Sequence, residues 1–158
     1  MKIFPVDAKL YRGGKLPLSD VPRLKKQGIT QVCDLRTNGA VKRNFLKIFY
    51  KIFNIDYKNT PFHIDRIELP DTDVFEKITG GINQNPGKTY IHCRNGNNRT
   101  GLVIAFYELK NGKKPQEILN DLISMGYGRH RKVKSQEITD LRAKHLKDFA
   151  AKYLKLDT

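Results

Sequence analysis

The sequence predicts one α/β domain over residues 1–158, with a mainly parallel central sheet of four to five strands flanked by helices. Strand-like and helix-like segments alternate along the chain, and parallel strands need a crossover between them, usually a helix. A chain of 158 residues, 39% of them hydrophobic, fits a single globular core. Ligands of such sheets bind at the carboxyl ends of the strands, so a functional site is expected at that edge.

The first third of the chain predicts two strands around a short helix. Residues 9–12 read as a short strand that ends at a pair of glycines. A helix is predicted from Ser19, whose hydroxyl can cap the first turn, to Gly28, which suits a left-handed helix end. Residues 29–35, ITQVCDL, are rich in β-branched side chains and predict a buried strand.

A basic helix is predicted near residues 41–53, and residues 55–64 are expected to be extended. Apolar side chains recur there at helical spacing, at Phe45, Ile48, Phe49, Ile52 and Phe53. Basic side chains occupy other positions of the same helix, at Lys42, Arg43, Lys47 and Lys51. We expect the apolar stripe to be core, with peripheral contact to an anionic membrane as the alternative.

The second half predicts a helix through residues 75–82 and then a short strand over residues 89–92. That strand runs directly into the loop HCRNGNNRTG, residues 92–101. A helix then continues to Gly112, Pro115 opens another, and a last helix follows the basic segment GRHRKVK.

The loop HCRNGNNRTG predicts an anion cradle, because loop amides and the first amides of the following helix converge on one spot. Cys93 would lie at its base, at a helix N-terminus and near Arg99, and both features favour a reactive thiolate over a thiol. Arg99 offers a planar fork for two phosphate oxygens. Gly96 lets the backbone curl around the anion. Cys93 is therefore the predicted nucleophile.

Other residues of the loop have predicted supporting roles. The hydroxyl of Thr100 can donate to the sulfur and stabilise the leaving thiolate, and His92 is expected to order the loop by hydrogen bonding to its backbone. The predicted phosphate-binding residues are Arg94, Asn95, Gly96, Asn97, Asn98 and Arg99. Arg94 adds a second charge and hints at a polyanionic substrate.

The complete pattern HCxxGxxRT resembles the signature of the cysteine-dependent protein tyrosine and dual-specificity phosphatases. LYRGG, GITQVCDLR and YKNTPFHID extend the resemblance to compact atypical dual-specificity phosphatases, over roughly residues 9–128. The resemblance implies a protein tyrosine phosphatase-like fold and a two-step reaction through a cysteinyl-phosphate. It implies neither a metal nor another cofactor.

The resemblance also implies a general acid, and the sequence offers several carboxylates for it. Asp65 follows the extended segment and lies 93 − 65 = 28 residues before the cysteine, which is close to the family's spacing. Asp71 and Asp73 are the alternatives, with Glu68 behind them and no conventional acid as a further possibility. Asp73 and Glu76 also fit a helix capping box, and either aspartate suits a helix start.

Three residues of the strand ITQVCDLR and its end have predicted structural roles. Asp34 and Arg36 are expected to hold loops in place, with Asp34 paired to an arginine such as Arg12, because buried charges need partners. Cys33 is expected to be a small buried hydrophobic residue. A protective disulfide between Cys33 and Cys93, as the resemblance would allow, is the alternative.

The chain has 30 Lys and Arg against 16 Asp and Glu, a net charge of +14, which indicates either an anionic partner or a lysine-rich surface without a specific partner. A phosphotyrosine protein is the first expected substrate, and phosphoinositides or inositol polyphosphates and pyrophosphates are the alternatives. An RNA 5′-triphosphatase and a non-catalytic phosphate-binding module are further ones. A basic rim is possible at Arg129, His130, Arg131, Lys132 and Lys134.

No apolar run is long enough to span a bilayer, and the start MKIFPVDAKLYR lacks the apolar stretch of a secretory signal. With only two cysteines, a reducing compartment is expected. We therefore expect a soluble cytoplasmic monomer.

Overall fold

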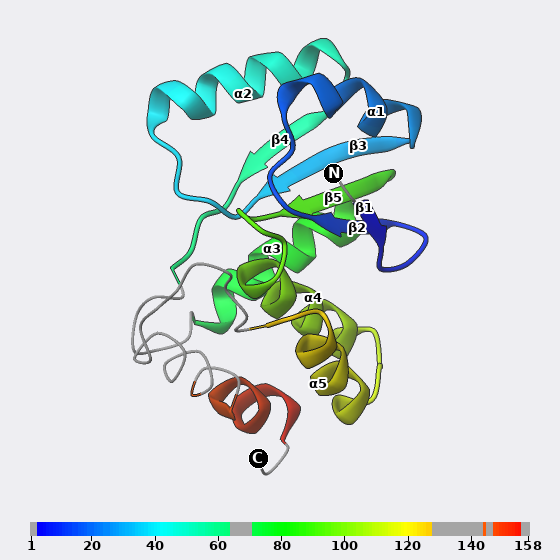
Figure 1. Cartoon of the computed structure of the whole chain (residues 1–158), viewed down its shortest axis with the longest axis vertical. Helices are drawn as coiled ribbons and strands as arrows, with labels where there is room; N and C mark the ends of the chain where they lie inside the picture. The colour runs from blue at the N-terminus through cyan, green and yellow to red at the C-terminus, as the bar shows by residue number, and fades with distance from the viewer. Residues whose placement is uncertain (1–2, 64–70, 128–143, 145–146, 156–158) are drawn as a thin grey trace.

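A five-stranded sheet in the order β1-β2-β5-β3-β4 organises the molecule, a computed structural model that describes residues 3–63, 71–127, 144 and 147–155 (Figure 1). The antiparallel pair β1–β2 lies at one end of the sheet, and every other neighbouring pair is parallel. The strands are β1 Ile3–Pro5, β2 Leu10–Gly13, β3 Ile29–Asp34, β4 Asp56–Asn59 and β5 Lys88–His92. The predicted fold class, a mainly parallel sheet flanked by helices, is confirmed.

Helices cover both faces of this sheet. The 3₁₀ turn η1 (Leu18–Asp20), α1 (Val21–Lys26) and α2 (Ala40–Ile52) lie on one face (Figure 1). The other face carries α3 (Thr72–Gln84), α4 (Asn98–Lys110) and α5 (Pro115–Ser124), and the π-helical turn η2 (Ala150–Leu154) packs against α5.

Two hydrophobic cores lie on opposite sides of the sheet, because successive side chains of a strand point to opposite faces. Val32 of β3 and Tyr90 of β5 belong to the core under α1 and α2. Their neighbours Cys33 and Ile91 belong to the larger core formed with α3, α4 and α5. Cys33 is thus the buried hydrophobic residue that the sequence predicts.

Two predicted helix caps are wrong. Ser19 lies inside η1, and the N-cap of α1 is Asp20, which makes no side-chain hydrogen bond there. The N-cap of α3 is Asp71, so Asp73 falls within the first turn. Glu76 forms an ion pair with Lys110 of α4 instead of closing a capping box. Packing of α3 against α4 offers Glu76 a cation that local sequence does not reveal.

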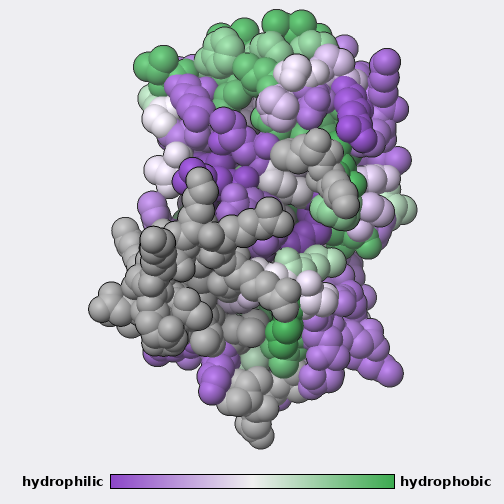
Figure 2. All heavy atoms as spheres, viewed as in Figure 1, coloured by the Kyte–Doolittle hydropathy of each residue, from purple (hydrophilic) through white to green (hydrophobic). Residues whose placement is uncertain are grey.

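The predicted apolar stripe of α2 is core only in part: Phe49 and Phe53 are half-buried and pack against the core under α1 and α2. Only Leu46 and Tyr50 of this helix are buried. Four apolar side chains are exposed instead, with exposed fractions of 86% for Val41, 53% for Phe45, 66% for Ile48 and 70% for Ile52. Figure 2 shows hydrophobic residues gathered at the top of the molecule, over α2. The helix therefore attaches to the sheet by one narrow side and presents a second apolar side outward.

Candidate active site

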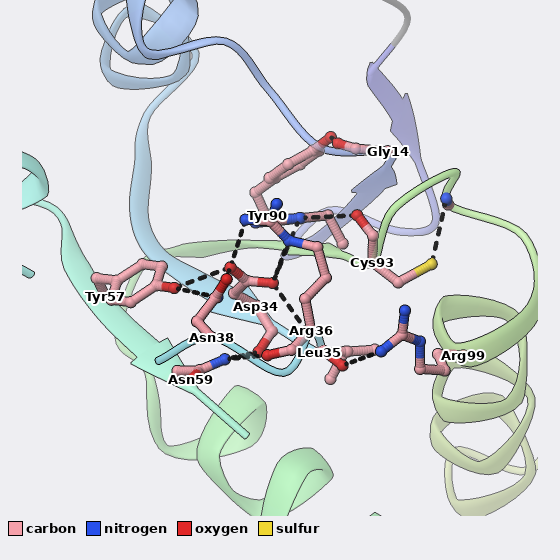
Figure 3. Close-up of polar contacts among 12 residues, drawn as sticks. Gly14, Asp34, Leu35, Arg36, Asn38, Tyr57, Asn59, Tyr90, Cys93 and Arg99 are labelled. Atoms are coloured by element: carbon pink, nitrogen blue, oxygen red, sulfur yellow. Dashed lines mark hydrogen bonds and ion pairs between the residues drawn. The ribbon is translucent and has the colours of Figure 1, made fainter. Parts of the chain in front are cut away.

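The loop between β5 and α4, residues 93–97, encloses the sulfur of Cys93. The backbone amide of Gly96 donates to the Cys93 Sγ at 3.3 Å, and both residues are buried (Figure 3). Gly96 adopts a φ of +83°, which favours glycine, and a Cβ there would lie 2.5 Å from the carbonyl carbon of Gly13. The N-cap Asn97 makes no side-chain cap hydrogen bond, so it does not occupy the first amides of α4. The described loop thus brings one amide of the predicted cradle, that of Gly96, onto the sulfur.

Strand β2 and the residues after it support the outside of this loop. Arg12 donates from Nη2 to the carbonyl of Gly96 at 2.6 Å, and the amide of Lys15 donates to the carbonyl of Arg94 at 3.0 Å. The hydroxyl of Tyr90 donates to the carbonyl of Gly14 at 2.7 Å. Arg12 and Lys15 thus hold carbonyls of the loop, and Tyr90 holds Gly14 beside it, while the Gly96 amide is left to the sulfur.

Arg99 stands in the first turn of α4, six residues after the cysteine in the signature. Its Nη1 donates to the carbonyl of Leu35 at 3.0 Å, and the amide of Leu35 donates to the carbonyl of His92 at 2.9 Å (Figure 3). Leu35 therefore connects the segment after β3 to both ends of the cradle.

Asp34 organises the segment after β3, and its carboxylate is fully buried. Arg36 donates to it from Nε at 2.8 Å and from Nη2 at 2.7 Å. Asn38 Nδ2 and the Tyr57 hydroxyl donate to it at 2.9 Å and 2.8 Å. Burial acts to raise the pKa of Asp34, but the hydrogen bonds and charge of Arg36, together with His92 and Tyr57, lower it below its ordinary value.

The structural role predicted for Asp34 fits these contacts, but the predicted partner Arg12 is wrong. Strand β2 is separated from β3 by β5 in the sheet, so Arg12 reaches the loop that follows its direct neighbour β5. Arg36 lies two residues beyond Asp34 and turns back onto it. Asn59 completes the arrangement by donating to the carbonyls of Asp34 and Arg36 at 2.7 Å and 2.8 Å.

His92 contacts the backbone of the cradle, as the sequence predicts. Its Nδ1 lies 3.1 Å from the carbonyl oxygen of Cys93, so this nitrogen carries the proton and donates. Burial lowers the pKa of His92, although Asp34 and the hydrogen bond to Cys93 act in the opposite direction. A neutral imidazole that holds a carbonyl orders the loop.

Thr100 is fully buried in the first turn of α4. Its hydroxyl has no hydrogen-bond partner in the described part of the chain, so the predicted bond to the Cys93 sulfur is absent here. An unpaired buried hydroxyl costs about 1–3 kcal/mol of stability.

The predicted general acids are only partly within the described residues. Asp65 and Glu68 lie outside them, as do the basic residues of the predicted rim, 129–134. Asp71 and Asp73 are exposed at the start of α3. Among the described residues, no group of three histidine, cysteine or carboxylate side chains could hold a metal ion.

A cavity of about 180 Å³ lies beside the cradle, next to His92. Its cations are Lys15, Arg36 and Lys42, and its aromatic lining comes from Phe45, Tyr50 and Tyr57. Arg36 is engaged with Asp34, which leaves the two lysines as the cations that could meet a ligand's charge.

Sequence reasoning missed several residues that order the surroundings of the cradle. The amide of Lys15 donates to the carbonyl of Arg94 in the loop itself. Asn59 donates to carbonyls of the segment after β3, and Tyr90 donates to the carbonyl of Gly14. The pair Gly13-Gly14 was the available signal, since a second glycine permits close approach of two backbones. A Cβ on Gly14 would lie 3.0 Å from the carbonyl oxygen of Arg94.

Comparison with known proteins gives a family match and similar folds. Residues 14–152 match a family model described as "Swiss Army Knife protein, DSP-PTPase phosphatase domain". TpbA from P. aeruginosa has a similar structure, with a TM-score of 0.67 and 18% identity over 98% of this chain and 91% of that chain. A structure of a cysteine-to-serine variant of TpbA in complex with pTyr has a TM-score of 0.67 and 17% identity, over 97% of this chain and 90% of that chain.

The core catalytic domain of the PP-IP phosphatase SIW14 from S. cerevisiae, in complex with citrate, is also similar. Its TM-score is 0.65 at 17% identity, over 99% of this chain and 96% of that chain. At these identities the likeness to solved structures concerns the fold.

Proposed function

Because the chain belongs to the family of DSP-PTPase phosphatase domains, which are cysteine-dependent phosphatases, we propose that it hydrolyses phosphomonoesters at Cys93. The single observation that carries this assignment is the Gly96 amide, 3.3 Å from the Cys93 Sγ in a cradle that opens α4. Hydrogen bonding to the charged form of a group favours that form. The same amides then suit the phosphate that the sulfur attacks.

The proposed reaction has two steps and a cysteinyl-phosphate intermediate. The Cys93 thiolate attacks phosphorus in line, so an S–P bond forms while the P–O bond to the leaving group breaks. A general acid gives its proton to the leaving oxygen. Water then attacks phosphorus, its proton returns to that acid, and the S–P bond breaks to restore the thiolate. Atoms and charge balance without a metal or another co-reactant.

Arg99 and Thr100 act on the two ends of the transferred phosphoryl group in this proposal. The guanidinium of Arg99 binds two phosphate oxygens and strengthens its hold as charge spreads in the transition state. Its bond to the Leu35 carbonyl orients the fork without using all its donors. The buried hydroxyl of Thr100 donates to the sulfur when the thiolate leaves.

Asp65 is the proposed general acid, with Asp71 as the alternative that the same experiment tests. Replacing Asp65 by Asn should lower kcat on phenyl phosphates about 100-fold or more and flatten the basic limb of the pH profile. Asp71→Asn is the matched control, since it makes the same change at the start of α3. The assignment is wrong if only the control shows this behaviour.

Phosphotyrosine in proteins is the first proposed substrate, in line with the pTyr complex of the similar protein TpbA. Inositol phosphates or phosphoinositides are the second candidate, because Lys15 and Lys42 line a cavity beside the cradle and could bind a further phosphate. The similar protein SIW14 is described as a PP-IP phosphatase.

We also propose a reducing, cytoplasmic location for the protein. Both cysteines are free, which supports this proposal.

A substrate panel tests the function. It contains a phosphotyrosine peptide, a phosphoserine peptide, phosphoinositides, inositol polyphosphates and triphosphorylated RNA. Wild type should be most active on the phosphotyrosine peptide, and Cys93→Ser should abolish turnover. Cys33→Ser is the matched control with unchanged turnover, because burial raises the pKa of Cys33 to about 12 and keeps its thiol inert. No turnover on any member would leave only the phosphate-binding module.

A further inference from the structure

Helix α2 carries an exposed apolar stripe that no described part of the chain covers. Its members are Val41, Phe45, Ile48 and Ile52, each more than half exposed. Their spacing of four, three and four residues brings them onto one side of the helix. Figure 2 shows this surface as a hydrophobic area over α2. Contiguous apolar patches of this kind mark interaction sites on soluble proteins.

Basic side chains flank the stripe on the same helix. They are Lys42, Arg43, Lys47 and Lys51, all exposed, and the segment from Ala40 to Ile52 contains no acidic residue. In the described part of the chain none of the four forms an ion pair. Two of them occupy the first turn, where positive charge opposes the helix dipole. The start of the helix therefore carries two cations, Lys42 and Arg43, that its own stability does not favour.

This combination fits an anionic lipid surface better than a second copy of the chain. Two α2 helices packed face to face would bring eight cations together, and like charges across an interface weaken it. A bilayer surface with anionic headgroups offers an apolar layer beneath a layer of negative charge. Long lysine side chains can reach that charge while apolar neighbours insert.

The length of α2 sets how it can meet a bilayer. Its 13 residues span about 20 Å, less than the roughly 30 Å of a hydrocarbon core. Among the described helices none is long and apolar enough to cross a membrane. An amphipathic helix of this kind lies in the plane of the interface.

The position of α2 joins this surface to the site. The helix begins after β3, at the carboxyl edge of the sheet, where the loop after β5 forms the cradle (Figure 1). Lys42 and Phe45 also line the cavity beside His92. We propose that α2 docks the protein on an anionic bilayer, with the apolar stripe inserted and the basic side chains on the headgroups.

Vesicle co-sedimentation tests this proposal directly. The probes are vesicles of phosphatidylcholine alone and of phosphatidylcholine mixed with phosphatidylserine. Wild type should bind the mixed vesicles, bind phosphatidylcholine weakly, and lose binding as salt is raised. Ile48→Asp and Ile52→Asp should each reduce the partition coefficient about tenfold or more, and Lys47→Glu should reduce it on mixed vesicles only.

Matched controls come from the opposite side of the sheet. Ile123→Asp and Lys114→Glu change an exposed apolar and an exposed basic residue of the α5 region, and neither should alter vesicle binding. Turnover of a soluble aryl phosphate should be unchanged in every variant, which separates docking from the chemistry at Cys93. Absent binding by wild type, or equal binding by the α2 variants, would overturn the proposal. A dimer in solution that Ile52→Asp dissociates would assign the stripe to a second copy instead.

Discussion

Two strand–loop–helix units lie side by side in this molecule and differ in what their loops enclose. One consists of β3, residues 35–39 and α2, and the other of β5, residues 93–97 and α4; β3 and β5 are parallel neighbours. The first loop folds around the carboxylate of Asp34, which the chain itself supplies. The second loop directs the Gly96 amide to the Cys93 sulfur. Two loops of equal length thus differ: the first surrounds a carboxylate of the chain itself, and the second is the one for which we propose a phosphate of the substrate.

The helices of the two units, α2 and α4, differ in how much of each is buried. Each has 13 residues, but α4 is buried without interruption from Thr100 to Tyr107. In α2 only Leu46 and Tyr50 are buried. The helix that follows the Cys93 loop is thus packed on all sides over these residues, whereas α2 leaves one apolar side exposed.

The largest expected difference is in stability. Leu102→Ala in the fully buried part of α4 should lower the free energy of unfolding by about 2–5 kcal/mol, because the cavity cannot collapse completely. Ile48→Ala at the exposed stripe of α2 should change it by less than about 0.5 kcal/mol. Urea denaturation with unchanged m values measures both. Similar losses in the two variants would contradict the comparison of the helices.

The next largest effect on stability is expected from removing the buried charge of Asp34. Asp34→Asn leaves the nearly buried Arg36 without its charge partner and should cost about 3 kcal/mol at neutral pH. Asp56→Asn, in the exposed pair with Lys58 at 3.7 Å, is the matched control with an effect below about 1 kcal/mol. Equal unfolding midpoints for the two variants would refute the role of Asp34.

The same pair of proteins gives a pH test. Because the pKa of Asp34 is lowered on folding, its contribution is present above the unfolded pKa of about 4 and is lost as pH falls through the folded pKa. The difference in unfolding free energy between wild type and Asp34→Asn should therefore shrink below about pH 4. A constant difference down to pH 2 or so would argue against the lowered pKa.

The glycines of the two loops should respond differently. Gly96→Ala places a Cβ at a φ of +83° and 2.5 Å from the Gly13 carbonyl carbon, so the cradle must shift. Turnover should fall about 100-fold. At Gly39, with a φ of −61° and nothing within 4 Å of a Cβ, alanine should leave turnover unchanged. Retained activity in Gly96→Ala would show that the close approach is not required.

The smallest expected loss of stability comes from removing a single tyrosine hydroxyl, that of Tyr90 or that of Tyr57. Tyr90→Phe removes the bond to the Gly14 carbonyl and should cost about 1 kcal/mol. Tyr57→Phe removes a bond to the charged Asp34 and should cost more, about 1.5–3 kcal/mol. Thermal unfolding of both variants checks the order, and a reversed order would count against the charged acceptor.

Local sequence predicted what depends on neighbours in the chain. The cradle was predictable because Cys93, Gly96 and Arg99 lie within one loop between a strand and a helix. The alternation of strands and helices likewise predicts a mainly parallel sheet, although it does not predict the order of the strands. Gly28, with its φ of +79°, ends the first helix region as predicted.

Contacts between distant segments were not predictable in the same way. Helical spacing places Phe45, Ile48 and Ile52 on one side of α2 but does not say what covers that side. The partner of Asp34 depended on strand order, which puts β5 between Arg12 and Asp34. The support of the cradle by Gly14 and Lys15 depends on contact between the backbone after β2 and the backbone of the loop after β5. Neither residue type predicts such a contact.

The two end strands of the sheet determine how the folded protein can associate with other chains. β1 has three residues and ends in Pro5, while β4 has four and exposes the charges of Asp56 and Lys58. Short, charged or proline-containing edges resist the addition of a further strand. Fibrous aggregation of the native state through its sheet is therefore disfavoured, and amyloid-like assembly would have to begin from unfolded chains.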